Sequence, residues 1–372
     1  MRVRAALAAL MLLTASGCVT IKRDAFTAAE QATAYPVGFP GVRYAGDASL
    51  GTIYKPPADH APVMIALSGG GANGAFGAGV LCGWSEAGTR PQFDVVTGVS
   101  TGALMAPYAF LGPKWDAQLR AAYTDGRTSH LLPFPFIKPL FRDSVYTGKR
   151  LYALVDRTIT PDMVAAIAAE HARGRRLLVA TTDLDTEKLI VWDIGAIATR
   201  GGPEARALIV TVLTASAAIP GVFPPVMIPA QMGSHVAAEL HVDGSTVGAF
   251  FALPDAALIR PVPGAANGGR IYVLINGKAD SEFTVTQRSL FSLLQRSFYT
   301  ASKAAQRTSL ETVAKFGEDN GVATFVAAVP PEATASSMDF RQPSMVALFE
   351  MGRQQAATGK AWADLPGVLK RR

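Results

Sequence analysis

The chain has little cysteine, little histidine and few charged residues for its length. Cys18 and Cys82 are the two cysteines among 372 residues, and the five histidines all lie at or before position 241. Charged residues make up 17% and hydrophobic residues 49%, so the chain can bury a multilayer core, and extensive disorder is excluded. Neither a repeat nor a long polar stretch divides the sequence, which favours one large domain.

The excess of positive charge is small and scattered. The net charge is +6, and removing the two arginines Arg2 and Arg4 leaves +4. Because the remaining basic residues form no cluster, the charge pattern does not support nucleic-acid binding.

The first residues have the pattern of a secretory signal. Arg2 and Arg4 give a basic start, Ala5 to Leu13 is an apolar run too short to span a bilayer, and small residues precede Cys18. Small residues ending on a cysteine resemble a bacterial lipoprotein signal; the alternative is an ordinary cleaved signal peptide. The resemblance implies that Cys18 is lipidated and holds the protein on a membrane of the bacterial cell envelope, the outer membrane on its periplasmic side or surface.

Export usually favours disulfides, but a lipidated Cys18 leaves Cys82 without a partner, so we expect none. Cys82 lies beside Leu81 and Trp84 in an apolar helical stretch, which favours a buried structural thiol. We expect residues 1–17 to be the signal peptide. Residues 18–61, rich in Gly, Pro and Ala, are expected to form a lipidated tether and an irregular lead-in.

Strand and helix patterns alternate along the rest of the chain, which is typical of a layered α/β fold. Apolar runs predict strands at Val63–Leu67, Phe93–Thr97, Leu177–Thr182, Leu189–Trp192, Leu240–Val242, Ile271–Ile275 and Ala323–Val329. Helical spacing predicts helices at Ala75–Glu86, Ala103–Leu111, Glu204–Thr214, Gln287–Phe316 and Met345–Trp362. The first two strands and the helix between them form a βαβ unit, so the two loops that follow these strands should be neighbours.

The sharpest motif is Gly98-Val99-Ser100-Thr101-Gly102, between a predicted strand and a predicted helix. A serine exposed on such a tight turn needs small neighbours, and Gly98 and Gly102 provide the room. This context indicates a nucleophile elbow with Ser100 as the nucleophile.

A second glycine-rich turn, Ser68 to Gly74, follows the first predicted strand. Its backbone N–H groups can hold a developing oxyanion at a helix N-terminus. A dinucleotide-binding loop is an alternative, because Gly69, Gly71 and Gly74 fit that pattern and Asp94 follows about 20 residues on. A P-loop fits less well because the Lys and Ser/Thr are missing, and a purely structural turn stays open.

A nucleophilic serine needs a base, and the sequence leaves two choices. One is Asp243, at the end of an apolar strand and followed by Gly244, where it would reach the same sheet edge as Ser100. The other is a triad in the order serine, acid, histidine. Its members would come from a small set: Asp183, Asp185 or Asp193, with His235 or His241.

Together these blocks resemble the patatin-like phospholipase family, whose members use a Ser-Asp dyad without histidine. The blocks stand in family order: Gly69 to Gly74, Gly98 to Gly102, Ala215 to Pro225, and Asp243-Gly244. Two positions depart from the family pattern. Asn73 stands where Arg or Lys is usual, and Ser245 stands where Gly or Ala is usual, although serine is small enough for the turn to survive.

The resemblance implies a three-layer α/β/α fold with a central, mostly parallel sheet, and a hydrolase without metal or cofactor that acts on lipid esters. Asp243 would accept the proton of Ser100, which attacks the acyl carbonyl. The oxyanion would lie among the N–H groups of Gly69, Gly70, Gly71 and Ala72, with Gly70 and Gly71 the main donors. Residues 62–330 would form the catalytic domain and residues 331–372 a C-terminal helical extension.

Two other functions remain compatible with the sequence: a catalytically silent envelope lipoprotein that uses the fold for binding, and an acyltransferase that passes the acyl group to an acceptor other than water. The apolar stretch from Leu131 to Ile137 is either a membrane-contacting flap or a buried connection.

Overall fold

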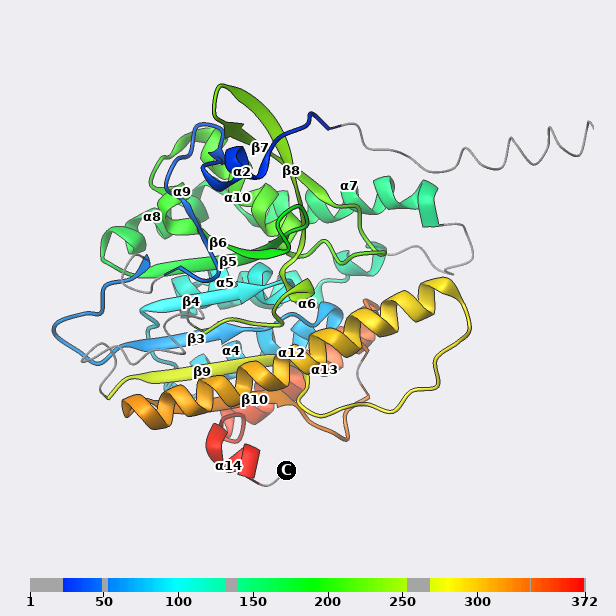
Figure 1. Ribbon diagram of the computed structural model, residues 1–372. Helices are drawn as coiled ribbons and strands as arrows, with labels where there is room; N and C mark the ends of the chain where they lie inside the picture. The colour runs from blue at the N-terminus through cyan, green and yellow to red at the C-terminus, as the bar shows by residue number, and fades with distance from the viewer. Residues whose placement is uncertain (1–22, 49–52, 132–139, 253–267, 335, 371–372) are drawn as a thin grey trace, which may run out of the picture.

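The computed structural model describes residues 23–48, 53–131, 140–252, 268–334 and 336–370 (Figure 1). Eleven strands in these residues form one sheet. They are β1 Tyr35–Pro36, β2 Arg43–Ala45, β3 Val63–Leu67, β4 Val95–Val99, β5 Arg176–Asp183, β6 Lys188–Asp193, β7 Val226–Met232, β8 His235–Asp243, β9 Arg270–Lys278, β10 Ala323–Val329 and β11 Ala363–Asp364.

The main helices are α2 Ala28–Ala32, α4 Gly74–Glu86, α5 Thr101–Leu111, α6 Asp116–Thr124, α7 Leu140–Thr158, α8 Pro161–Ala172, α9 Ile194–Ala198, α10 Gly202–Ser216, α12 Leu290–Asn320, α13 Gln342–Ala357 and α14 Leu365–Lys370. Short 3₁₀ turns are η1 Gly71–Asn73, η2 Pro113–Trp115, η3 Arg127–His130 and η4 Gly244–Thr246.

The middle of the sheet is parallel and its edges are antiparallel. Strands β5, β4, β3, β9 and β10 are neighbours in that order, and each pair among them is parallel. The β7–β8 hairpin and β1 extend one edge, and β11 closes the other, all by antiparallel pairing. This mixed, mostly parallel sheet confirms the fold class expected from the sequence.

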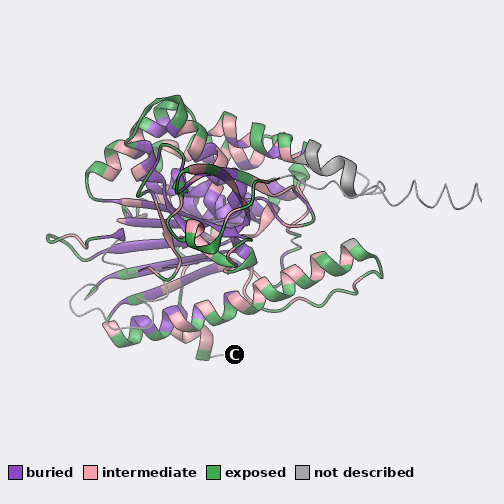
Figure 2. Cartoon of the chain, turned by 45° about the horizontal axis from the view of Figure 1, so that its top comes forward, coloured by how far each residue is buried: buried purple, intermediate pink, exposed green. Residues whose placement is uncertain are grey.

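Both faces of the sheet are covered, because its central strands are apolar on each side. In β3, Val63, Ile65 and Leu67 pack into one hydrophobic core, whereas Met64 and Ala66 pack into a second core. The first core is shared with α4, α5, α8, α10 and α13, and the second with α12 and α14. The result is three layers, with buried residues concentrated along the strands (Figure 2).

Helix α13 packs closely against α4 through glycines. A Cβ on Gly79 would lie 2.0 Å from the carbonyl oxygen of Phe349, and one on Gly352 would lie 2.2 Å from that of Phe76. The last long helix of the chain is thus part of the layer that contains α4.

The sequence predicted that this helix would continue to Trp362. It ends at Ala357 because Gly359 takes a left-handed conformation with φ of +72°. The residues that follow form β11, which pairs with β10.

The predicted signal peptide, Cys18, and most of the stretch from Leu131 to Ile137 lie outside the described residues. In the described part of the chain, none of the helices combines the length and the apolar character needed to cross a membrane.

Candidate active site

Ser100 forms the turn between β4 and α5 in a strained backbone conformation. Its φ is +55° and its ψ is −126°, a region that residues other than glycine rarely adopt. The flanking glycines are required by close packing. A Cβ on Gly98 would lie 2.7 Å from the Cα of Ala103, and one on Gly102 would lie 2.2 Å from the carbonyl oxygen of Leu67. The local geometry is that of the nucleophile elbow expected from the sequence.

A second serine, which the sequence analysis did not single out, supports this turn. The backbone N–H of Ser100 donates to Ser216 Oγ at 3.0 Å, and Ser216 Oγ donates to the carbonyl oxygen of Ala180 at 2.7 Å. Ser216 is fully buried at the end of α10. It therefore ties the strained residue to the neighbouring strand β5, which offsets part of the conformational cost.

Strand register brings Asp243 to Ser100. Along one edge of β5, Ala180 pairs with Val99 of the parallel strand β4, and the next residue, Thr181, pairs with Asp243 of the antiparallel strand β8. Two strands running in opposite directions thus meet end to end on β5. Ser100 directly follows Val99, so the serine and the aspartate lie at the junction.

The carboxylate of Asp243 is fully buried and incompletely hydrogen-bonded. One oxygen, Oδ1, accepts from the N–H of Ser245 at 2.8 Å, while Oδ2 has no partner of normal geometry among the described residues. Burial raises the pKa of Asp243 to about 6, although the nearby hydroxyl of Ser100 and the N–H of Ser245 oppose the rise. A carboxylate with such a pKa can accept a proton from a serine near neutral pH.

The glycine-rich loop lies directly beside these two residues. A Cβ on Gly69 would lie 3.2 Å from the Cβ of Ser100 and 2.4 Å from Ser245 Oγ. A Cβ on Gly70 would overlap the carbonyl oxygen of Asn276 on β9, at 1.8 Å. Close side-chain contacts therefore explain Gly69, and close approach to a backbone carbonyl explains Gly70. Ser245, one of the two departures from the family pattern, fits in the turn η4.

Two of the four expected oxyanion donors are already engaged. The N–H of Gly69 donates to the carbonyl oxygen of Ala249 at 3.0 Å, and the N–H of Ala72 donates to that of Ser337 at 2.9 Å. No acceptor is found within the described residues for the N–H groups of Gly70 and Gly71. Those two groups are therefore the ones available to an oxyanion.

The dinucleotide alternative does not fit the structure. Asp94 precedes β4 and accepts from the N–H of Val63 at 2.8 Å, at the amino end of the strands. The glycine loop follows β3 at the opposite, carboxyl end. An acidic residue that binds a ribose would have to lie at the end that holds the loop.

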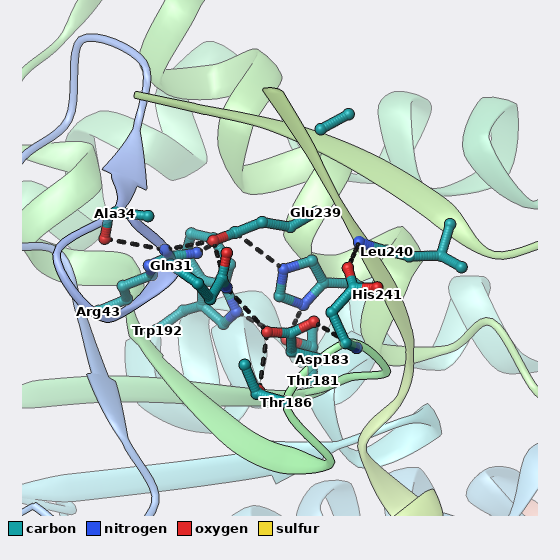
Figure 3. A network of polar contacts seen from close by, with 12 residues as sticks. Gln31, Ala34, Arg43, Thr181, Asp183, Thr186, Trp192, Glu239, Leu240 and His241 are labelled. Carbon is teal, nitrogen blue, oxygen red and sulfur yellow. Dashed lines mark hydrogen bonds and ion pairs between the residues drawn. The ribbon is translucent and has the colours of Figure 1, made fainter. Parts of the chain in front are cut away.

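The acids and histidines of the alternative triad are bound elsewhere. His241 is fully buried, with Nδ1 3.0 Å from Thr181 Oγ1 and Nε2 3.2 Å from Glu239 Oε2, so both ring nitrogens are occupied (Figure 3). His235 lies 3.7 Å from Glu30. Asp185 pairs with Arg23, and Asp193 caps α9 through the N–H of Ala196.

Figure 3 shows the network that holds His241 and Asp183. Arg43 of β2 donates to both carboxylate oxygens of Glu239 on β8, and Gln31 of α2 bridges Glu239 and Asp183. Burial pushes the pKa of Glu239 upward, but Arg43 and His241 outweigh it and lower the pKa to about 2. The expected lead-in is thus fixed to β8, the strand that ends at Asp243.

Tyr299 of α12 is a further residue near the site that the sequence analysis missed. Its hydroxyl is buried and has no hydrogen-bond partner of normal geometry in the described part of the chain. Burial raises the pKa of Tyr299 to about 12; Ser337 opposes the rise and the charge of Asp243 adds to it. The sequence places Tyr299 in a long helical pattern, but no local pattern indicates that it lies near Asp243 and Ser337.

Both candidate catalytic residues are buried. Ser100 is 3% exposed and Asp243 is 0% exposed. A cavity of about 610 Å³ lies between the ends of β9 and β10 and the segment from Ala279 to Thr284, and neither residue lines it.

Comparison with known proteins gives one family, and the similar solved structures include two of low sequence identity. A sequence profile described as patatin-like phospholipase matches residues 65–255. The crystal structure of VipD from Legionella pneumophila is 12% identical with a TM-score of 0.34, and the match covers 83% of this chain and 69% of that chain. The type III effector protein ExoU is 15% identical with a TM-score of 0.23, covering 80% of this chain and 54% of that chain. A search of curated proteins finds no match.

Proposed function

The chain belongs to the patatin-like phospholipase family, and from this premise we propose that it is a serine hydrolase that cleaves acyl esters of lipids through Ser100 and Asp243. The observation that carries the proposal is the end-to-end meeting of β4 and β8 on β5. It supports the pairing of a strained serine with a buried carboxylate of raised pKa, and the glycine-rich loop after β3 adds support because Gly69 lies against Ser100.

The proposed reaction has two steps. Asp243 accepts the proton of Ser100 as Oγ forms a bond to the acyl carbonyl carbon, and the negative charge that develops on the carbonyl oxygen is held by the N–H groups of Gly70 and Gly71. The C–O bond to the leaving alcohol breaks as Asp243 returns the proton to that alcohol. Water then attacks the acyl-enzyme by the same route, giving the fatty acid and free Ser100.

We also propose that Cys18 carries a lipid that anchors the protein to a membrane of the cell envelope. The support is the order of basic start, short apolar run and small residues before the cysteine. Such an anchor would hold the catalytic residues near their substrate.

The pH dependence of hydrolysis tests the proposed base. Because Asp243 must be ionised to accept a proton and its pKa is about 6, kcat/KM should rise about tenfold per pH unit below 6 and level off above about 7. The measurement is hydrolysis of p-nitrophenyl butyrate and of phosphatidylcholine vesicles from about pH 4.5 to about pH 8. The lower limit lies well below the raised pKa of Asp243. A rate that stays level between pH 5 and 7 would contradict Asp243 as the base, and absence of turnover on every ester would contradict the function itself.

A further inference from the structure

The described residues that expose the most apolar surface are gathered at the start of α12. Thirteen large hydrophobic residues are exposed in the described part of the chain, and the five most exposed lie within residues 283–294. These are Phe283 at 95%, Val285 at 80%, Leu290 at 74%, Leu294 at 53% and Leu293 at 51%. An apolar patch of this kind marks an interaction surface, whereas single exposed leucines need no explanation.

Three of these residues share one face of the helix. Leu290, Leu293 and Leu294 have the spacing i, i+3, i+4, so their side chains lie together on the outer side of α12. Phe283 and Val285 precede the helix in the same exposed segment. We call the five residues the apolar tip of α12.

The opposite face of the same helix reaches the candidate active site. Tyr299 lies on that inner face, and its buried hydroxyl is close to Ser337 and to the charge of Asp243. The carbonyl oxygen of Ser337 in turn accepts from the N–H of Ala72 in the glycine-rich loop. In Figure 1 the start of α12 extends beyond the sheet on the side where β3 and β9 end, which is the side of Ser100.

The charge around the apolar tip has a small positive excess: from Lys278 to Glu311 the chain holds five basic residues and three acidic ones. From Phe283 to Leu310 the chain holds four basic residues and no acidic residue. Three of the four, Arg296, Lys303 and Arg307, donate hydrogen bonds to uncharged oxygens of the segment before the helix. Glu282 and Asp280 of that segment lie near Lys303, whereas Arg288, the basic residue next to Leu290 in sequence, has no acidic neighbour between Phe283 and Leu310. An apolar tip with an excess of positive charge is complementary to a bilayer that contains anionic lipids.

We propose that the apolar tip of α12 is the surface by which this protein docks on an anionic lipid bilayer. The inference rests on the proposed function, because a lipid hydrolase whose serine is buried needs a surface that brings it to its substrate. The leucines enter the acyl region, the basic residues meet the anionic head groups, and α12 connects this contact to Tyr299 beside the site. The anchor proposed at Cys18 would hold the protein near the membrane, whereas the tip would orient the catalytic edge toward it.

A fluorescent reporter at the tip tests the proposal locally, so that residues 1–22 do not affect the result. In the full chain with Cys18→Ser, Cys82 is buried and does not compete for labelling. The probe NBD is attached at Leu293→Cys, or, as a matched control, at Val236→Cys on the β7–β8 hairpin, where the native side chain is similarly exposed at 47%. On vesicles of phosphatidylcholine and phosphatidylglycerol, NBD at 293 should gain intensity and shift to the blue, and NBD at 236 should not.

A triple variant measures how much the apolar tip contributes to the free energy of vesicle binding. Leu290→Gln/Leu293→Gln/Leu294→Gln should weaken partitioning onto the same vesicles by at least about tenfold, because each leucine that leaves water contributes about 1.5–3 kcal/mol. Hydrolysis of soluble p-nitrophenyl butyrate should stay unchanged. If the parent protein hydrolyses no ester while NBD at position 293 still responds to the vesicles, the proposed function is wrong and the docking proposal still holds.

Three results would overturn the docking proposal. The first is an equal NBD response at positions 293 and 236. The second is an equal response of NBD at position 293 to vesicles of phosphatidylcholine alone, which would show that anionic lipids are not needed for binding. The third is a blue shift at 293 that appears without vesicles as protein concentration rises, which would identify a second copy of this chain as the partner.

Discussion

Replacing Ser100 with alanine should reduce ester hydrolysis by at least about 10³-fold, because the acyl-enzyme cannot form without the serine oxygen. What remains in Ser100→Ala is the N–H pair of Gly70 and Gly71, which can still polarise a carbonyl. The loss should fall on kcat, with KM little changed, since the serine side chain adds little to binding of the ground state. The measurement is kcat and KM on p-nitrophenyl butyrate and on a phospholipid.

The control for this variant is Ser85→Ala. Ser85 Oγ donates to the carbonyl oxygen of Leu81 near the end of α4 and accepts from Arg90, which also pairs with Asp116, so this change removes a serine hydroxyl that the mechanism does not use. Ser100→Ala should melt close to the parent, and Ser85→Ala should remain folded with full activity. The strained backbone at position 100 is kept by alanine, which has the same Cβ. If Ser100→Ala hydrolysed esters at a tenth of the parent rate or faster, the nucleophile would be another group, since a lost nucleophile costs at least about 10³-fold.

Asp243→Asn should abolish hydrolysis to a similar degree and at the same time stabilise the fold at pH 8. The amide cannot accept the proton of Ser100, so the rate falls by about 10²–10⁴-fold. Asparagine keeps the shape of the side chain, and its Oδ1 can still accept from the N–H of Ser245. The change removes a charge that is fully buried at neutral pH.

The sign of the stability effect follows from the raised pKa. Because the folded protein holds the Asp243 proton up to about pH 6, above the ordinary value of 3.8, stability from this group is present at low pH and is lost as pH rises through 6. At pH 8 its ionisation costs about 3 kcal/mol, an order-of-magnitude figure that Asp243→Asn should recover in part. Urea unfolding should show the gain at pH 8, a smaller gain at pH 5, and none below about pH 4. A variant less stable than the parent at pH 8 would contradict the burial argument.

Much of the catalytic edge could be predicted from sequence because its signals are local. The run Val63–Leu67 is buried at every position, so it reads as a continuous apolar strand, and β3 has these bounds. The glycines around Ser100 are needed for contacts with residues a few positions away or on the adjacent strand. Such requirements leave a residue-type pattern that a single sequence displays.

The position of Asp243 could be predicted only in part. Its strand was recognised from a short apolar run, but β8 begins at His235, and its partner β7 was not predicted because Pro229 interrupts the apolar run there. The end-to-end meeting of β4 and β8 depends on the register of β5 with both strands, which no local pattern encodes. Ser216 and Tyr299 were missed for the same reason, since their roles arise from distant contacts.

The N-terminal segment illustrates a different limit. Strands β1 and β2 contain two and three residues, too few for an alternating pattern, and the segment was therefore expected to be irregular. What fixes β2 is the pairing of Arg43 with the buried Glu239, together with backbone pairing to β6. A buried ion pair between residues almost 200 positions apart leaves no sequence signal in either segment.

The most direct test of the dyad is the rate at which a fluorophosphonate modifies Ser100. The probe should add to Ser100, as located by peptide mass spectrometry, in the parent protein and in His241→Gln at rates within about threefold, because both nitrogens of His241 are turned to Thr181 and Glu239. In Asp243→Asn the rate at pH 7 should fall by at least about 10²-fold. Labelling that persists in Asp243→Asn but is lost in His241→Gln, with both variants folded by circular dichroism, would contradict the Ser-Asp account and favour a histidine as the base.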